Sequence, residues 1–146
     1  MRTPLLLTVL IALIVALPVT SGDAKRRTRT TFVSPTRTTL CQIVLATGKQ
    51  RTYIRCDVQN ATNAAPDKPK SCEFDWGFSF GMRVRGNAYR NCVSDAIGDP
   101  KKAKRLAYGA TESLGGISCH SQQTGMTCTN KSGHGFSLSR QQQKLF

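Results

Sequence analysis

The feature of this sequence that most limits its possible folds is a set of six cysteines spread along the chain from residue 41 onward. They are Cys41, Cys56, Cys72, Cys92, Cys119 and Cys128. All six follow a basic start and a long apolar run, a combination typical of chains that are exported and then oxidised. Six cysteines can pair in about 15 ways, so their spacing alone leaves the disulfide pattern open.

The amino-terminal segment predicts export. Arg2 is followed by an almost wholly apolar run from residue 5 to 19, and the small residues beyond it predict cleavage after Ser21 or Ala24. We therefore predict a signal peptide at residues 1–24 and a mature protein that is secreted, periplasmic or bound to the cell envelope. An uncleaved anchor is the alternative, but the run is shorter than the roughly 20 residues that a membrane span needs.

The charge balance is strongly basic. The chain has 21 Lys and Arg residues against 8 Asp and Glu, for a net charge of +13, and cleavage would leave 20 − 7 = +13. The remaining length suits one domain, which we place at residues 32–146 behind a disordered basic arm at residues 25–31. No later stretch is apolar enough to span a membrane. Large apolar residues are sparse, so we expect disulfides to supplement a modest core.

Residues 39–45 and 52–58 are rich in β-branched side chains and flank a turn, so they predict a β-hairpin. Joining Cys41 to Cys56 makes Gly48-Lys49 the two-residue loop, and glycine at the first loop position suits a type II′ turn. In that register the cysteines fall at a hydrogen-bonded pair, where Cα atoms lie farther apart. A bulge or a longer loop is therefore an open alternative.

Residues 117–121 and 126–130 predict a second hairpin. The register that opposes Cys119 to Cys128 places them at a non-hydrogen-bonded pair, where the strands are closer and a cross-strand disulfide fits well. The Cys119–Cys128 pairing is the disulfide that the sequence supports best.

Cys72 and Cys92 are then left to each other. Between them lie an aromatic stretch and the alternating residues 82–85, which predict strands on both sides of a turn near Gly86-Asn87. A zinc site is the alternative use of the cysteines, but the chain has no Cys-x-x-Cys pair. We expect no metal and no cofactor.

The other segments read as coil with one further strand. Residues 60–70 predict a polar loop, residues 101–105 a basic loop or one short helical turn, and residues 106–108 a strand. The fold class expected from these patterns is all-β: a small, antiparallel, sheet or barrel-like domain of hairpins stapled by disulfides.

Several motifs lie between Phe32 and the last residue. They are Phe32-x-Ser34-Pro35, Arg55-Cys56-Asp57, Cys72-x-x-Asp75-Trp76-Gly77, Cys92-x-Ser94-Asp95, Tyr108-Gly109 and the long block from Gly125 to Arg140, with Gly-x-Thr-Cys-Thr-Asn-x-x-Gly-His-Gly-Phe-x-Leu-Ser-Arg. In these motifs the chain resembles a family of secreted bacterial domains of unknown function. It departs at residues 36–40, where a Gly-Asn-Ile turn is usual. The resemblance implies an exported bacterial protein with sequentially paired cysteines, and it implies no activity.

Two histidines, His120 and His134, are the side chains that can act as unperturbed bases near neutral pH. His134 lies between two glycines, so it can be a base or an anion ligand at a loop mouth, with Ser132, Ser139 or Arg140 as its partner. The structural alternative, which we favour, packs its ring over the turn at residues 129–130. His120 is expected to be structural or simply exposed.

Asp75 and Trp76 allow a carbohydrate interpretation, with the indole as a platform for a sugar face and the carboxylate for its hydroxyls. We favour a core position for Trp76, because a thin core gains most from burying the one tryptophan. A glycosidase would need a second placed carboxylate. No pattern singles one out among the other acidic residues, Glu73, Asp95, Asp99 and Glu112.

Basic residues are the other functional candidates, because they can form a cationic surface that matches phosphate-rich polymers. The candidates are Lys25, Arg26, Arg27, Arg83, Arg85, Arg90, Lys101, Lys102, Lys104 and Arg105. The alternative is that the charge only keeps an exported domain soluble. Asn60-Ala61-Thr62 and Asn130-Lys131-Ser132 match N-glycosylation sequons, which matter only in a eukaryotic secretory route.

These patterns favour a small exported β domain that binds rather than converts. Its expected role is an envelope-associated module that contacts an anionic envelope polymer or nucleic acid. The alternative is a small secreted hydrolase of the ribonuclease kind, with His134 and His120 as its bases.

Overall fold

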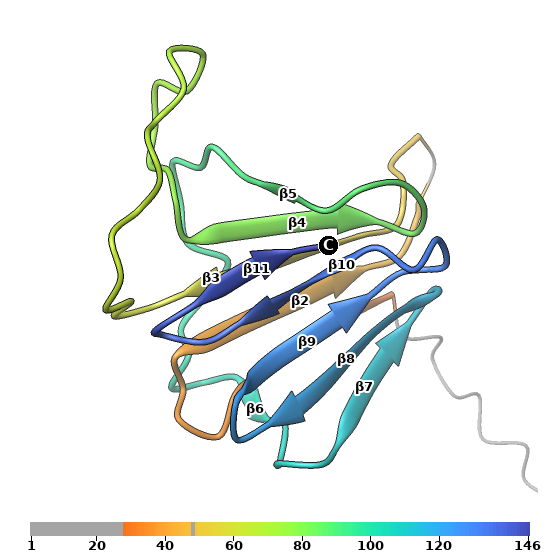
Figure 1. The fold of residues 1–146 in the computed structure, drawn as a ribbon. Helices are drawn as coiled ribbons and strands as arrows, with labels where there is room; N and C mark the ends of the chain where they lie inside the picture. Colours follow the sequence, from red (N-terminus) through yellow and green to blue (C-terminus); the bar gives the residue numbers. More distant parts are fainter. Residues whose placement is uncertain (1–27, 48) are drawn as a thin grey trace, which may run out of the picture.

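The computed structural model describes residues 28–47 and 49–146. Within these ranges the chain forms eleven β-strands and no helix, and the strands make two sheets (Figure 1). The predicted signal peptide lies outside the described residues. Among those described, no helix has the length and apolar character needed to cross a membrane.

The first sheet has six strands in the order β5-β4-β3-β2-β1-β6. Their neighbours run antiparallel, except that β6 runs parallel to β1. The strands are β1 (Arg29–Val33), β2 (Thr39–Val44), β3 (Tyr53–Val58), β4 (Ser79–Arg83), β5 (Tyr89–Arg90) and β6 (Lys104–Arg105).

The second sheet is a five-stranded antiparallel meander in the order β11-β10-β9-β8-β7. Each strand pairs with the next one along the chain. The strands are β7 (Thr111–Leu114), β8 (Ile117–Gln122), β9 (Gly125–Thr129), β10 (Gly135–Leu138) and β11 (Gln143–Leu145).

The core lies between the two sheets, because alternate residues of the central strands point inward from each. In β3 and β9 buried residues alternate with half-buried ones. Phe80 of the first sheet and Phe136 of the second have ring centroids 6.1 Å apart. The predicted all-β class is therefore confirmed as a sandwich of two open sheets, and the sheets do not close into a barrel.

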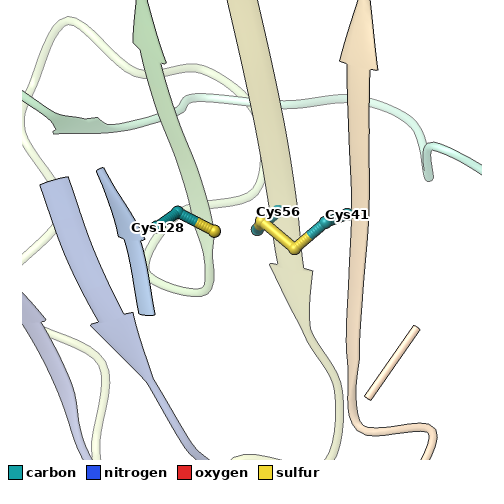
Figure 2. A group of neighbouring side chains, drawn as sticks. All are labelled: Cys41, Cys56 and Cys128. Carbon is teal, nitrogen blue, oxygen red and sulfur yellow. A yellow bond between two sulfur atoms is a disulfide. The ribbon is translucent and has the colours of Figure 1, made fainter. Parts of the chain in front are cut away.

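All three predicted disulfides are present: Cys41–Cys56, Cys72–Cys92 and Cys119–Cys128. The first and the third each join neighbouring strands of one sheet, and they face each other across the core. Figure 2 shows Cys128 directed toward the Cys41–Cys56 bridge, and the three sulfur atoms lie within 4.8 Å of one another. Because each sulfur is already in a disulfide, this cluster is part of the core and not a metal site.

The register predicted for the first hairpin is confirmed, with Cys41 opposite Cys56 and Thr47 opposite Gln50. The expectation that the two cysteines form a hydrogen-bonded pair is wrong. Their Cα atoms are only 4.1 Å apart, as in the closer, non-hydrogen-bonded type of pair. The ladder is interrupted between strand and turn, where the Ala46 N–H donates to Thr52 Oγ1 at 2.8 Å. Counting hydrogen-bonded and non-hydrogen-bonded pairs outward from the turn therefore gives the wrong pair type for the two cysteines. The predicted turn type depends on residue 48, outside the described ranges.

Two expectations near the ends of the first sheet are wrong. Residues 29–31 of the supposed disordered arm begin β1, since their threonines pair with β2; residues 25–27 lie outside the described part. The later strand is β6, on the basic residues 104–105, and not residues 106–108. Lysine and arginine suit such an exposed edge because they discourage pairing with another chain. Leu106 leaves the strand and is buried, with its N–H donating to Val33 O.

Candidate functional site: a basic groove and an adjoining cleft

The outer face of the first sheet carries a concentration of cations at the tip of the β2–β3 hairpin and at the end of β4. Four side chains, Lys49, Arg51, Arg83 and Arg85, line two hollows of about 480 and 410 Å³. Lys49, Arg51 and Arg83 line both hollows, so the two are continuous. We call this surface the basic groove.

Strand register brings these cations together. Tyr53 lies opposite Arg83 in the β3–β4 ladder, and continuing the same register places Arg51 beside Arg85. The sequence interpretation included Arg83 and Arg85 but missed Lys49 and Arg51. The β3–β4 register was the missing signal, because these two strands are separated by a long loop whose length hides the pairing.

The groove is open to an anion. No acidic residue lines either hollow, and within the described ranges none of the four cations has an ion pair. Tyr53 and Tyr89 line one wall, and Tyr89 is 41 % exposed. Its ring lies against Gly81, where an added Cβ would come within 2.8 Å of Tyr89 Cε2. The glycine therefore lets the tyrosine lie flat on the strand.

Asn130 fixes the end of β4 from the opposite sheet. Its buried side-chain amide donates to the Arg83 carbonyl at 3.0 Å and to the Gly86 carbonyl at 2.7 Å. Its oxygen accepts from the backbone N–H groups of Ser132 at 2.9 Å and His134 at 3.2 Å. The two bonds to Arg83 and Gly86, together with the bond from the Lys131 N–H to the Val84 carbonyl at 3.0 Å, hold the carboxy-terminal block against the β4–β5 turn, while the other two bonds lie within the block. The block therefore positions the groove's arginines.

A second hollow, here called the cleft, adjoins the groove on the same face. It has a volume of about 570 Å³, and Arg55 lines both the cleft and the groove. Its floor comes from β3 and β4, and its walls come from residues 75–78 and 93–96. The walls are joined by the backbone bridge between Asp75 and Val93, close to the Cys72–Cys92 disulfide.

Arg55 holds the floor and one wall together. It donates to both carboxylate oxygens of Asp57 at 2.9 Å and, across the cleft, to Asp95 Oδ1 at 2.9 Å. Asp57 also accepts from Ser79 Oγ at 2.7 Å. Burial acts to lower the pKa of Arg55, but the hydrogen bonds and charges of the two aspartates outweigh it and raise that pKa above its ordinary value. This arginine is therefore a structural cation.

Trp76 is not in the core, contrary to the sequence interpretation. It is half-buried in the cleft wall, and its Nε1 is buried without a hydrogen-bond partner among the described residues. Phe80 and Phe136 fill the core instead. β4 begins only at Ser79, so the aromatic residues before it belong to the loop.

The other predicted anion-binding residues do not join the groove. Arg90 points to the inner side, stacks over Phe80 at 4.7 Å and donates to the Gly77 carbonyl. Burial lowers its pKa from the ordinary value. The basic residues from Lys101 to Arg105 lie at the β6 edge, with four strands between β6 and β5. Lys25, Arg26 and Arg27 lie outside the described residues.

The structure does not bring the two histidines into one site. His120 lies on β8, where its Nδ1 is 3.0 Å from Thr111 Oγ1. His134 lies in the β9–β10 turn, bonded through its backbone to Asn130. The partners considered for it are engaged elsewhere, since Arg140 Nε donates to the Asn60 carbonyl and Ser139 bonds to Gln142.

These features define a small, disulfide-bridged, all-β sandwich domain with a cationic outer face. Its sequence matches the model of a family described as "Family of unknown function (DUF6636)" over residues 6–146, and the chain therefore belongs to this family. No curated protein and no solved structure matches it. The family carries no assigned activity, so an account of function rests on the geometry of this chain.

Proposed function

We propose that this protein is an exported, non-catalytic binding module that holds phosphate-bearing polymers in the basic groove. The observation that carries the proposal is the convergence of Lys49, Arg51, Arg83 and Arg85 on one continuous hollow that no acidic side chain lines. Cations placed in this way gain from contact with phosphates mainly by releasing the polymer's counterions.

The groove also suits a chain-like ligand better than a small anion. It is shallow and open, and it extends from the hairpin tip across β4 to Tyr89. Tyr53 and Tyr89 offer flat, partly exposed surfaces beside the cations, so that non-phosphate parts of a polymer have apolar contact. The rest of the +13 charge would speed the encounter with such a polymer.

Export is part of the same proposal. It rests on the signal-peptide pattern at residues 1–24 and on the three disulfides, which persist in oxidising compartments. The single domain would then meet the polymers of an envelope, with phosphate as the repeated anionic group.

The hydrolase alternative has less support. A ribonuclease-like mechanism needs an acid and a base within reach of one phosphate. His120 and His134 lie on different elements, and neither lines the basic groove.

The test compares two variants that lose the same charge from two separate parts of one sheet. The groove variant carries Lys49→Gln, Arg51→Gln, Arg83→Gln and Arg85→Gln. The edge variant, its matched control, carries Lys101→Gln, Lys102→Gln, Lys104→Gln and Arg105→Gln. Both remove four positive charges from exposed side chains. Binding of labelled polyphosphate and labelled single-stranded DNA is measured by anisotropy over a salt series, and strand cleavage is followed in the same samples.

We expect the groove variant to bind polyphosphate at least about tenfold more weakly at low salt, and to lose about 0.7 from the salt slope for each phosphate contact removed. The edge variant should keep most of the affinity. Equal losses in both variants would show that net charge alone attracts the polymer and would contradict the proposal. Cleavage that a His134→Ala change abolishes would establish the hydrolase instead.

A further inference from the structure

The cleft beside the basic groove has no role in the proposed phosphate binding, and its chemistry differs from that of the groove. Three aspartates and one arginine line it, together with Trp76 and Phe78. Because Arg55 lines both hollows, a ligand held in the groove can reach the cleft without leaving the surface.

The polar side chains of the cleft fall into two groups. Asp57 is fully occupied by Arg55 and Ser79, so it belongs to the floor. Gln59, Asp75 and Ser94 have no side-chain hydrogen bond within the described ranges, although all three line the cleft. They offer an amide, a carboxylate and a hydroxyl, which together can both donate and accept.

Trp76 supplies the apolar part of the same wall. Its position is a poor one for stability alone, because a buried indole N–H without a partner costs on the order of 1–3 kcal/mol. The ring is nonetheless held in place, since Asp75 just before it is bridged to Val93 and Cys72 is bonded to Cys92. An aromatic ring fixed at the wall of an open cleft is available to stack on a ligand.

An aromatic face next to several uncommitted hydrogen-bonding groups matches a pyranose or furanose ring, which presents apolar C–H faces and a rim of hydroxyls. Resting on the proposed phosphate binding, we infer that the cleft is a saccharide subsite and that the polymer recognised by this protein is a glycan that carries phosphate. The polymer's phosphates would lie in the basic groove on Arg83 and its neighbours, and a sugar farther along the same polymer would lie on Trp76.

Trp76 is the one tryptophan of the chain, so its fluorescence reports on the cleft directly. The mature, oxidised protein is titrated with glucose, galactose, N-acetylglucosamine, glucose 1-phosphate, inorganic phosphate and choline. We expect at least one sugar to change the emission saturably, and glucose 1-phosphate to bind no more tightly than glucose, because the one arginine of the cleft is already bonded to Asp57 and Asp95. Inorganic phosphate alone should leave the emission unchanged.

Two variants assign the response to the cleft. Asp75→Asn should weaken sugar binding by about tenfold, since it removes an ionised hydrogen-bond acceptor. Asp67→Asn is the matched control, because Asp67 is exposed on the preceding loop and does not line the cleft, and it should bind as the unmodified protein does. Trp76→Ala, followed by calorimetry, should abolish binding while the melting curve stays cooperative.

The inference is overturned if no sugar changes the emission while acrylamide quenching shows the indole to be accessible. It is equally overturned if choline is the ligand that binds, which would make the cleft a site for a cationic group. Failure here is separate from failure of the proposed function. Retained, groove-dependent polyphosphate binding with no sugar response removes only the saccharide subsite. Sugar binding without polyphosphate binding removes the proposed function and the phosphate-bearing polymer inferred from it, and leaves the cleft as a saccharide site alone.

Discussion

Two of the three disulfides lie inside the sandwich, whereas the third, Cys72–Cys92, joins two loops outside it. The sulfur-bearing residues of the inner pair are all fully buried and bridge strands that also share ladder hydrogen bonds. Cys72 is buried, but Cys92 is exposed, and its loops share only the short bridge at Asp75 and Val93. The inner disulfides therefore act on a core that is already organised, while the outer one positions the walls of the cleft.

The contrast indicates how this fold separates stability from recognition. Side chains that point inward from the sheets, such as Phe80 and Phe136, make one continuous core. Side chains that point outward from β3 and β4 alternate with them and make the groove and the cleft. One-residue alternation along the same strands thus serves both purposes.

The largest effect is expected from removing an inner disulfide. Loop entropy alone assigns about 2.6 kcal/mol to a closed loop of 9 residues and about 3.3 kcal/mol to one of 20, the sequence separations of Cys119–Cys128 and Cys72–Cys92. Cys119→Ala with Cys128→Ala also leaves a cavity between the sheets, so we expect a loss of about 4 kcal/mol. Urea unfolding monitored by far-UV circular dichroism measures it. A smaller loss than that of the loop disulfide would break the comparison.

Removing the outer disulfide should cost less and change recognition more. We expect Cys72→Ala with Cys92→Ala to lower the free energy of unfolding by about 3 kcal/mol or less. The walls of the cleft would then no longer hold Trp76 in place, so the emission response to sugars should be lost. Polyphosphate affinity should stay within about twofold, because the groove lies on the strands and on the β4–β5 turn. Parallel loss of both ligands would contradict the separation of cleft and groove.

Asn130 tests the connection between the carboxy-terminal block and the groove. Asn130→Ala removes four partly buried hydrogen bonds, including those to the Arg83 and Gly86 carbonyls, so we expect a loss of about 2 kcal/mol and weaker polyphosphate binding. Asn87→Ala is the control, since Asn87 is an exposed residue of the same β4–β5 turn. Thermal unfolding and anisotropy measured on both variants decide the point. Unchanged affinity in a folded Asn130→Ala protein would show that the block does not position the groove.

The smallest effect is expected at Arg55. Arg55→Gln leaves Asp57 with Ser79 as its remaining side-chain partner. The ion pair that is lost is only partly exposed, with 14 % of the Arg55 side chain and 16 % of the Asp57 side chain accessible. We expect a loss of about 1.5 kcal/mol, together with faster amide exchange at residues 93–97. Hydrogen exchange measured by mass spectrometry locates the change. Exchange that stays unchanged at the wall would show that backbone bonds hold it without the arginine.

The parts of the structure that the sequence predicts correctly depend on local pairing. Both hairpins have β-branched strands around short turns, so the registers of Cys41 with Cys56 and of Cys119 with Cys128 follow from a few neighbouring residues. The all-β class and the third disulfide follow from these two pairings.

What the sequence interpretation missed depends on contacts between distant segments. Lys49 and Arg83 meet only because β3 pairs with β4 across a loop of some twenty residues. Asn130 reaches the Arg83 carbonyl from the other sheet, and no local pattern indicates this bond. Trp76 was assigned to the core because the core is thin and the chain has one tryptophan, but its position in the loop before β4 decided its burial. The type of a side chain therefore does not predict its burial where the ends of the strands are not known.

Binding of the polymer to the outer face of β3 and β4 can be located residue by residue. The most direct measurement is a set of amide chemical shifts of the oxidised mature protein, recorded while short-chain polyphosphate is added. We expect the largest changes to fall on residues 49–53 and 83–89, with the β6 edge and the turn of His134 little affected. Changes centred on residues 101–105, or spread evenly over the basic side chains, would contradict it.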